Sequence, residues 1–158
     1  MRNMATDEAG TSAPEPVTLV VALLVHVATQ WLPAVRELRH LFGQVPAQYH
    51  EGFAFHAKWI SAANKYPDWK EKDRTEFMCS VMNLPGTFNI PIALGAMKRG
   101  ASDWSEWAEK KMTPEKVDHF MAFTMCMARA GHFLRTYCGY EMGQPSSRAR
   151  ILRLGWHR

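Results

Sequence analysis

The sequence predicts an α/β domain in which a sheet is flanked by helices. Two apolar runs, Leu19–Val25 and Ile90–Ala96, contain residues that favour strands, and the stretch 114–137 has the length and composition of a long core helix. We expect the two runs to be neighbouring strands of one sheet, with the helix packed on a face of that sheet.

The first of these strands follows Pro14 and Pro16, which separate it from the opening segment. Residues 18–25 are rich in β-branched side chains and apolar on both faces, a pattern typical of a central strand that is covered on both sides. From Gln30 to Phe42 the apolar residues recur at helical spacing, and Gly43 marks the predicted end of this helix.

The middle of the sequence predicts a short strand, Gly52–Phe55, that leads into a helix near His56. Another helix follows, for which Asp68 is the expected N-cap and Glu71 its capping-box partner. The Pro-Gly pair at 85–86 is expected to end that helix.

The second apolar run contains Pro91, which indicates an edge strand or a bulge. Residues 102–112 form a short amphipathic segment. Thr113 is the expected N-cap of the long helix, with Pro114 at its first position and an end near Cys138.

The length of 158 residues suits one domain, which we place at residues 1–142 ahead of a basic tail at 143–158. The net charge is +4, and most of it comes from arginines in the tail, so the charge is weak evidence for nucleic acid. The three cysteines form no CxxC pair, which predicts a reduced, cytoplasmic setting. The apolar run at 17–28 is too short to span a bilayer, so no membrane association is expected.

Asp7 and Glu8 precede a turn-rich stretch and the first apolar run. Taken alone, two adjacent acids near a terminus are most simply solvated. His56 alone is most simply a hydrogen-bonded histidine at a strand end, and Lys98 with Arg99 is most simply a solvated strand terminus. The sequence contains no P-loop, dinucleotide fingerprint or Ser-His-Asp motif.

Four segments occur in an order that is similar to a known family. They are DEAGTSAPEPVTLVVALLVH, FAFHAKWI, IPIALGAMKRG and MAFTMCMARAGHFLR, and they lie within residues 5–138. The chain resembles the domain of unknown function 3800 family. Its members open with a strand ending in D-E-[SA]-G, carry a histidine after a short strand in the middle, and have a long helix later. The DEAG tetrapeptide is a weak signal by itself, and the four segments in this order are moderately specific.

The resemblance implies a ribonuclease H-like fold and a metal-dependent nuclease or phosphodiesterase. In such folds acidic residues at strand ends bind Mg²⁺ or Mn²⁺, which prefer oxygen ligands and stabilise charge on the reacting oxygens of a phosphodiester. Asp7 matches the first-strand aspartate and Glu8 its neighbour, so both are expected at the metal. His56 matches the family histidine, expected to orient water, contact phosphate or act as a general base. Three cations are candidate phosphate contacts: Lys58, Lys98 and Arg99.

The sequence differs from the family pattern at both ends, so we expect a truncated member with an incomplete C-terminal part. The opening MRNMAT is polar where the family has an apolar strand. Glu141 is the only acid where the family has a further strand with acidic residues. The alternative is a catalytically inactive remnant or a protein-binding module that keeps the scaffold. The expected partners are accordingly nucleic acid, or another chain in a homo- or hetero-oligomer.

Overall fold

The computed structural model describes residues 1–10, 15–100, 112–138 and 144–145. The chain divides into two compact units, each with its own hydrophobic core. The first unit contains the described residues of 1–27 and 91–149, and the second contains Ala28–Ile90. The single domain expected over residues 1–142 therefore consists of two compact units.

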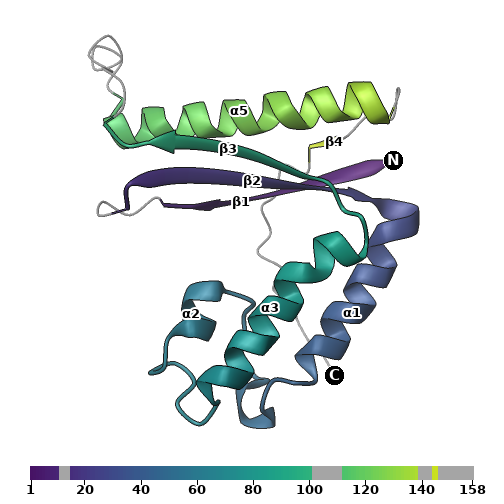
Figure 1. Cartoon of the computed structure of the whole chain (residues 1–158), viewed down its shortest axis with the longest axis vertical. Helices are drawn as coiled ribbons and strands as arrows, with labels where there is room; N and C mark the ends of the chain where they lie inside the picture. Colours follow the sequence, from purple (N-terminus) through teal and green to yellow (C-terminus); the bar gives the residue numbers. More distant parts are fainter. Residues whose placement is uncertain (11–14, 101–111, 139–143, 146–158) are drawn as a thin grey trace. The chain divides into compact units, whose positions relative to one another are not determined.

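The first unit is a sheet with one long helix on one face (Figure 1). The strand order is β3-β2-β1-β4. β2 is antiparallel to both β1 and β3, whereas β4 is parallel to β1. The elements are β1 (Arg2–Ala9), β2 (Val17–His26), β3 (Ile92–Lys98), β4 (Gln144–Pro145) and α5 (Pro114–Tyr137).

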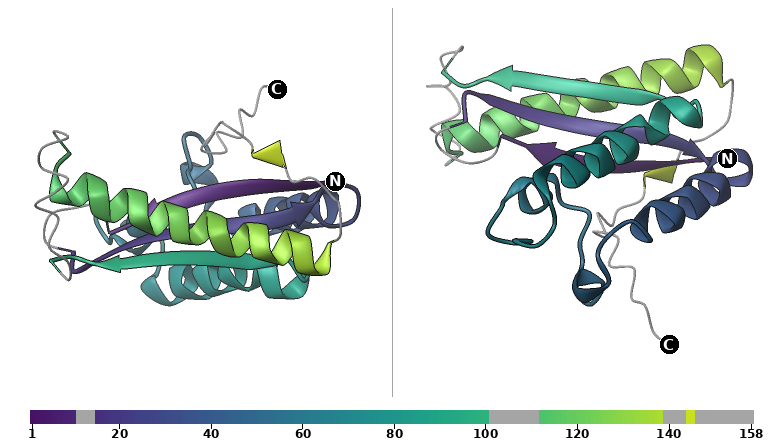
Figure 2. Two further views of the ribbon diagram at one scale, coloured as in Figure 1. Left: turned by 90° about the horizontal axis from the view of Figure 1, so that it is seen from above. Right: turned by 60° about the horizontal axis from the view of Figure 1, so that its bottom comes forward.

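The predicted centre of the sheet is confirmed. β2 pairs with β3 in a register that places Val21 opposite Leu94, and α5 packs against both strands. Figure 2 shows α5 lying over the strands on one face of the sheet. β3 is an edge strand of the described sheet, as Pro91 indicated, and Thr113 is the N-cap of α5.

A stripe of small side chains brings α5 close to the sheet. Ala122, Cys126 and Ala130 recur every four residues and are buried, which places them on one face of the helix. A Cβ atom at Gly95 of β3 would lie 1.8 Å from the Ala122 carbonyl oxygen, so only glycine permits this approach. The sheet residues of this core cluster are Val20, Ala22, Leu24 and Ala93.

The prediction that β2 is covered on both faces holds for one face. On the face away from α5, Val21 and Leu23 are half-buried, and their partners on β3, Leu94 and Ile92, are 43% and 51% exposed. A continuous apolar run cannot by itself distinguish a strand buried on both faces from one covered on a single face.

The second unit is helical and has an aromatic core. Its elements are α1 (Leu32–Phe42), η2 (Ala47–Tyr49), α2 (Ala57–Ser61) and α3 (Glu71–Thr87), and the chain enters it through the π-helical turn η1 (Val27–Trp31). α1 confirms the helix predicted before Gly43. The core is formed by Leu41, Val45, Ile60, Tyr66, Trp69, Phe77 and Leu84.

The strand predicted at Gly52–Phe55 was wrong, because these residues have no regular secondary structure. Phe53 and Phe55 instead pack on Phe77, with ring centroids 6.0 and 5.8 Å apart. Burial of two aromatic rings in a helical core satisfies the same alternating apolar pattern that predicts a strand.

Both ends of α3 differ from the predicted N-cap at Asp68 and the predicted end at the Pro-Gly pair 85–86. Lys70 is the N-cap of α3, and Asp68 makes no capping bond; its carboxylate lies 3.4 Å from the Tyr49 hydroxyl, which donates to it. α3 continues through Pro85 to Thr87. A proline in the last turn costs one backbone hydrogen bond there, which tertiary packing can offset.

Two other predictions fall on residues that the structure does not describe. These are the amphipathic segment, apart from Met112, and the tail at 143–158, apart from β4. Among the helices of the described part of the chain, none has the length and apolar character needed to cross a bilayer.

Replacing Gly95 by alanine should destabilise the first unit by about 2 kcal/mol or more, because the new methyl group would meet backbone atoms of α5 that cannot rotate away. Chemical denaturation measures this loss. Gly86→Ala is the matched control: nothing lies within 4 Å of a Cβ atom at Gly86, so its stability should be equal or slightly higher. Equal stability of the two variants would contradict the close approach of helix and strand.

Candidate functional site

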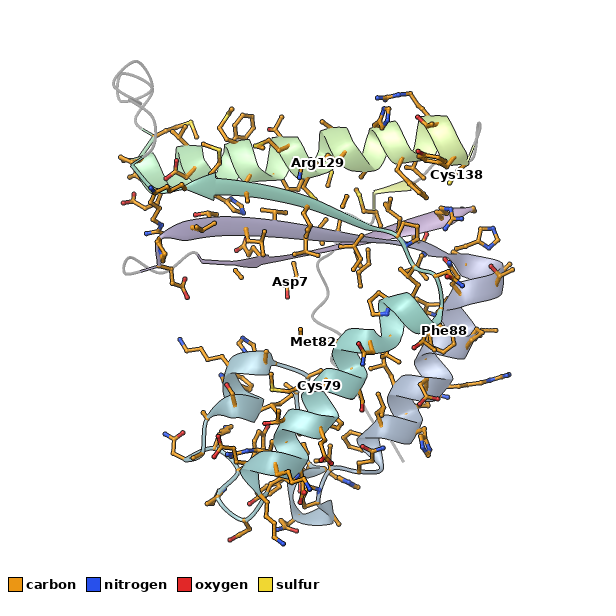
Figure 3. The ribbon with its side chains drawn as sticks, viewed as in Figure 1. Asp7, Cys79, Met82, Phe88, Arg129 and Cys138 are labelled. Carbon is orange, nitrogen blue, oxygen red and sulfur yellow. The ribbon has the colours of Figure 1, made fainter. Side chains whose placement is uncertain are left out.

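Asp7 and Glu8 lie next to each other near the end of β1 and point to opposite faces of the sheet. Glu8 is on the face that α5 covers, where its carboxylate pairs with the imidazole Nε2 of His119. Asp7 pairs in register with Val21, on the other face, and Figure 3 shows it directed away from α5. Because neighbouring strand residues alternate between faces, the two carboxylates do not converge on one ion.

Glu8 belongs to a shallow pocket at the carboxyl ends of β1 and β3. Both strands are antiparallel to β2, so they run in the same direction and end at the same edge, and α5 begins there. The carboxyl edge of strands that lead into helices is where α/β folds commonly bind ligands. The pocket has a volume of about 210 Å³ and is lined by Glu8, Thr18, Arg99, Glu115, Lys116 and His119.

Backbone contacts fix Arg99 at this edge. Its guanidinium Nη2 donates to the Gly10 carbonyl oxygen (2.9 Å), and its backbone N–H donates to the Pro16 carbonyl oxygen (3.0 Å). Gly10 has a φ of +76°, and a Cβ there would lie 1.7 Å from the Val17 carbonyl oxygen. Gly10 therefore allows the turn from β1 toward β2, which holds the Arg99 charge beside the strand end.

The first turns of α5 supply the other side chains that line this pocket: Glu115, Lys116 and His119. The Thr113 hydroxyl accepts from the backbone N–H of Lys116 (3.4 Å), which caps the helix. Glu115 and His119 are four residues apart and so lie on the same face of α5. The pKa of Glu115 lies below its ordinary value because its carboxylate accepts from its own backbone N–H and from the Thr113 hydroxyl, with a further contribution from the Arg99 charge.

The pocket thus combines anionic, cationic and titratable groups. Two carboxylates, Glu8 and Glu115, face the two cations Arg99 and Lys116, and His119 is held by Glu8. A carboxylate that orients an imidazole is the usual arrangement around a histidine that accepts a proton. Within the residues that the structure describes, no three or more His, Cys, Asp or Glu side chains are arranged to hold a metal ion.

The other predicted site residues lie apart from this pocket. His56 and Lys58 belong to the second unit, at the N-cap and in the first turn of α2. Lys98 is the last residue of β3, and its side chain is exposed. Of the six residues predicted from sequence, the structure therefore brings Glu8 and Arg99 together at the pocket.

Sequence reasoning missed three of the pocket's side chains on α5: Glu115, Lys116 and His119. A signal for them exists. The Thr113-Pro114 cap was recognised, and polar residues in the first turns of a helix that follows a strand lie close to the end of that strand. The apolar residues that dominate the long helix predict a core helix and give no indication that its first turns line a pocket.

Comparisons of the chain with protein-family models, with curated proteins and with solved structures give no match.

Thr113→Ala should raise the pKa of Glu115 toward its ordinary value, because the variant removes one of the hydrogen bonds that stabilise the carboxylate. A carboxyl NMR titration measures this change. The same variant should lose about 1 kcal/mol of stability through loss of the helix cap. Because the folded pKa is depressed, the contribution of Glu115 to stability is present above its unfolded pKa and disappears as pH falls through the folded value.

Thr124→Ala is the control for this titration, because Thr124 lies in the same helix and its hydroxyl donates to the Phe120 carbonyl oxygen, away from the cap. It should leave the Glu115 pKa unchanged. An unchanged Glu115 pKa in Thr113→Ala would contradict the proposed geometry of the cap.

Proposed function

We propose that this chain is a ribonuclease H-like protein of the domain of unknown function 3800 type that hydrolyses phosphodiester bonds with Mg²⁺ or Mn²⁺ at the pocket defined above. The observation that carries the proposal is the Glu8–His119 pair, held beside Arg99 and Lys116 at the shared carboxyl edge of β1 and β3.

The topology supports this proposal. The resemblance implies a first strand ending in the DEAG motif, a later long helix and a further strand after that helix. In the structure β1 ends at Ala9, α5 is the long helix, and β4 follows it and lies beside β1 in parallel. A strand parallel to β1 after the long helix is the order of elements that the resemblance implies.

The charges around the pocket suit a phosphodiester. Arg99 and Lys116 supply donors for the non-bridging phosphate oxygens, and the N-terminal end of α5 adds the partial positive charge of unpaired backbone N–H groups. Glu8 orients the His119 ring, so that its other nitrogen can take the proton of an attacking water.

A bound divalent cation would stabilise the charge on the reacting oxygens and lower the pKa of water. Glu8 and Glu115 would offer carboxylate oxygens, the ligands that Mg²⁺ and Mn²⁺ prefer, and the second nitrogen of His119 stays available for the proton of the attacking water. Asp7, which the resemblance places at the metal, lies on the opposite face of β1, so we assign the ligand role to Glu8.

A second candidate function is a non-catalytic scaffold that binds nucleic acid or a protein partner. The specific observation in its favour is that the described residues contain no cluster of three or more metal-ligating side chains. Under this alternative, the pocket would bind an anionic group and His119 would keep its contact with Glu8.

Cleavage of single-stranded and duplex oligonucleotides with Mg²⁺ or Mn²⁺ tests the proposal. Glu8→Gln and His119→Ala should each lower the rate by about 100-fold or more, since one removes a charged ligand and the other a general base. Asp7→Asn is the adjacent control and should stay within about three-fold of the wild-type rate.

Loss of cleavage in Asp7→Asn with normal cleavage in Glu8→Gln would move the site to the other face of the sheet and contradict our assignment. Absence of metal-dependent cleavage from every substrate, together with retained oligonucleotide binding, would favour the non-catalytic alternative.

A further inference from the structure

The second unit exposes an aromatic side chain that its core does not use. Trp59 in α2 is 43% exposed, whereas Trp69 of the same unit is 4% exposed and belongs to the aromatic core. Ile60, which follows Trp59 in the sequence, is 3% exposed and packs in that core. The buried Ile60 therefore fixes α2 to the core, while the Trp59 indole of the same helix stays at the surface.

The exposed indole is part of a stacked group. The His56 ring lies 5.0 Å from the Trp59 ring, centroid to centroid, with an angle of 18° between the planes. The ammonium of Lys65 lies 5.3 Å from the centre of the same indole. Two nearly parallel rings at the surface are oriented as successive bases are in a stack.

Two lysines, Lys58 and Lys65, accompany this group. The sixteen residues from Gly52 to Pro67 contain these two lysines and no acidic residue, and Glu51 and Asp68 border the stretch. Both lysines are exposed, and neither has an ion-pair partner among the residues that the structure describes. An exposed aromatic with cations beside it is complementary to an anionic, planar ligand.

Arg74 of α3 holds the loop that carries Lys65 in place through hydrogen bonds to its backbone. Arg74 of α3 is 5% exposed, and its Nη1 donates to the carbonyl oxygens of Ala62 and Tyr66, both at 3.4 Å. These two carbonyls flank Lys65 in the chain, so the guanidinium fixes the loop between α2 and α3. The binding group is thus arranged before a ligand arrives, which lowers the entropic cost of binding.

We propose that His56, Trp59, Lys58 and Lys65 form a stacking site for an unpaired base of single-stranded nucleic acid. The base would take the place of the Lys65 ammonium over the indole, Lys65 would turn to one neighbouring phosphate, and Lys58 would contact another. Stacking requires a base whose faces are accessible, which favours a single strand over a duplex. The choice of nucleic acid rests on the proposed function, which the site extends by naming a substrate form. In this stacking site His56 stacks on Trp59 and does not transfer a proton.

The test is binding of a fluorescein-labelled 15-mer of deoxythymidine to the full chain in EDTA, measured by fluorescence anisotropy. Trp59→Ala should weaken binding by about ten-fold or more, as expected for loss of one base–aromatic stack. Trp59→Phe should recover most of the affinity, because it keeps an aromatic face. Trp31→Ala is the matched control, since Trp31 is 38% exposed and lies outside this group; it should bind like the wild type.

A second measurement separates stacking from charge. The double variant Lys58→Gln/Lys65→Gln should reduce the slope of log affinity against log salt concentration by about one to two, as expected for the loss of two phosphate contacts. Inorganic polyphosphate should compete with the oligonucleotide less well than an unlabelled 15-mer does. Trp59→Ala should leave polyphosphate binding unchanged, because polyphosphate has no base to stack.

Three outcomes would overturn the stacking site. These are no binding of the 15-mer by the wild type, Trp59→Ala binding within two-fold of Trp31→Ala, and equal loss of polyphosphate binding in Trp59→Ala. The proposed function fails separately. Loss of cleavage in Glu8→Gln concerns the pocket, whereas loss of binding in Trp59→Ala in EDTA, where no metal-dependent cleavage occurs, concerns the stacking site.

Discussion

The close approach of α5 to β3 at Gly95 is the constraint on which the first unit depends. The helix backbone lies where a Cβ atom at Gly95 would overlap the Ala122 carbonyl oxygen. The small residues of the helix stripe make this approach possible, and the Cys126 thiol donates to the Ala93 carbonyl oxygen at 3.4 Å. Any side chain at Gly95 would overlap backbone atoms of α5.

The candidate site follows from the directions of the strands. β1 and β3 end at the same edge because β2 lies between them and runs the other way. α5 starts at this edge, so its capped first turns stand beside the last residues of β1. Residues that lie 91 or 111 positions apart in the chain, Glu8 with Arg99 and Glu8 with His119, are thereby brought to one pocket.

Much of the first unit could be predicted from sequence because its signals are local. The β-branched run of β2, Pro91 ahead of an edge strand and the Thr113-Pro114 cap each act within a few residues. The divergence of Asp7 and Glu8 was also predictable in principle, since strand residues alternate between faces. The family motif treats the two acids as a unit, although as neighbours in β1 their side chains lie on opposite faces of the sheet.

The remaining features depend on contacts between distant residues. The alternating aromatic residues around Phe53 predict a strand, and only the packing of Phe77 from α3 shows why they form a helical core instead. The partner of Glu8 could not be identified from spacing, because His119 reaches it through the approach of α5 to the sheet. Sequence patterns locate elements well when the cause is local and poorly when it is tertiary.

The proposed function requires that a metal ion bind at the shared edge of β1 and β3, where Glu8 and His119 meet. Paramagnetic broadening of histidine ring resonances by substoichiometric Mn²⁺ tests it most directly. His119 should broaden first, and His132, thirteen residues further along α5 and about 20 Å away by helical rise, should remain sharp. Equal broadening of the two rings, or a sharp His119 resonance at saturating Mn²⁺, would contradict the account.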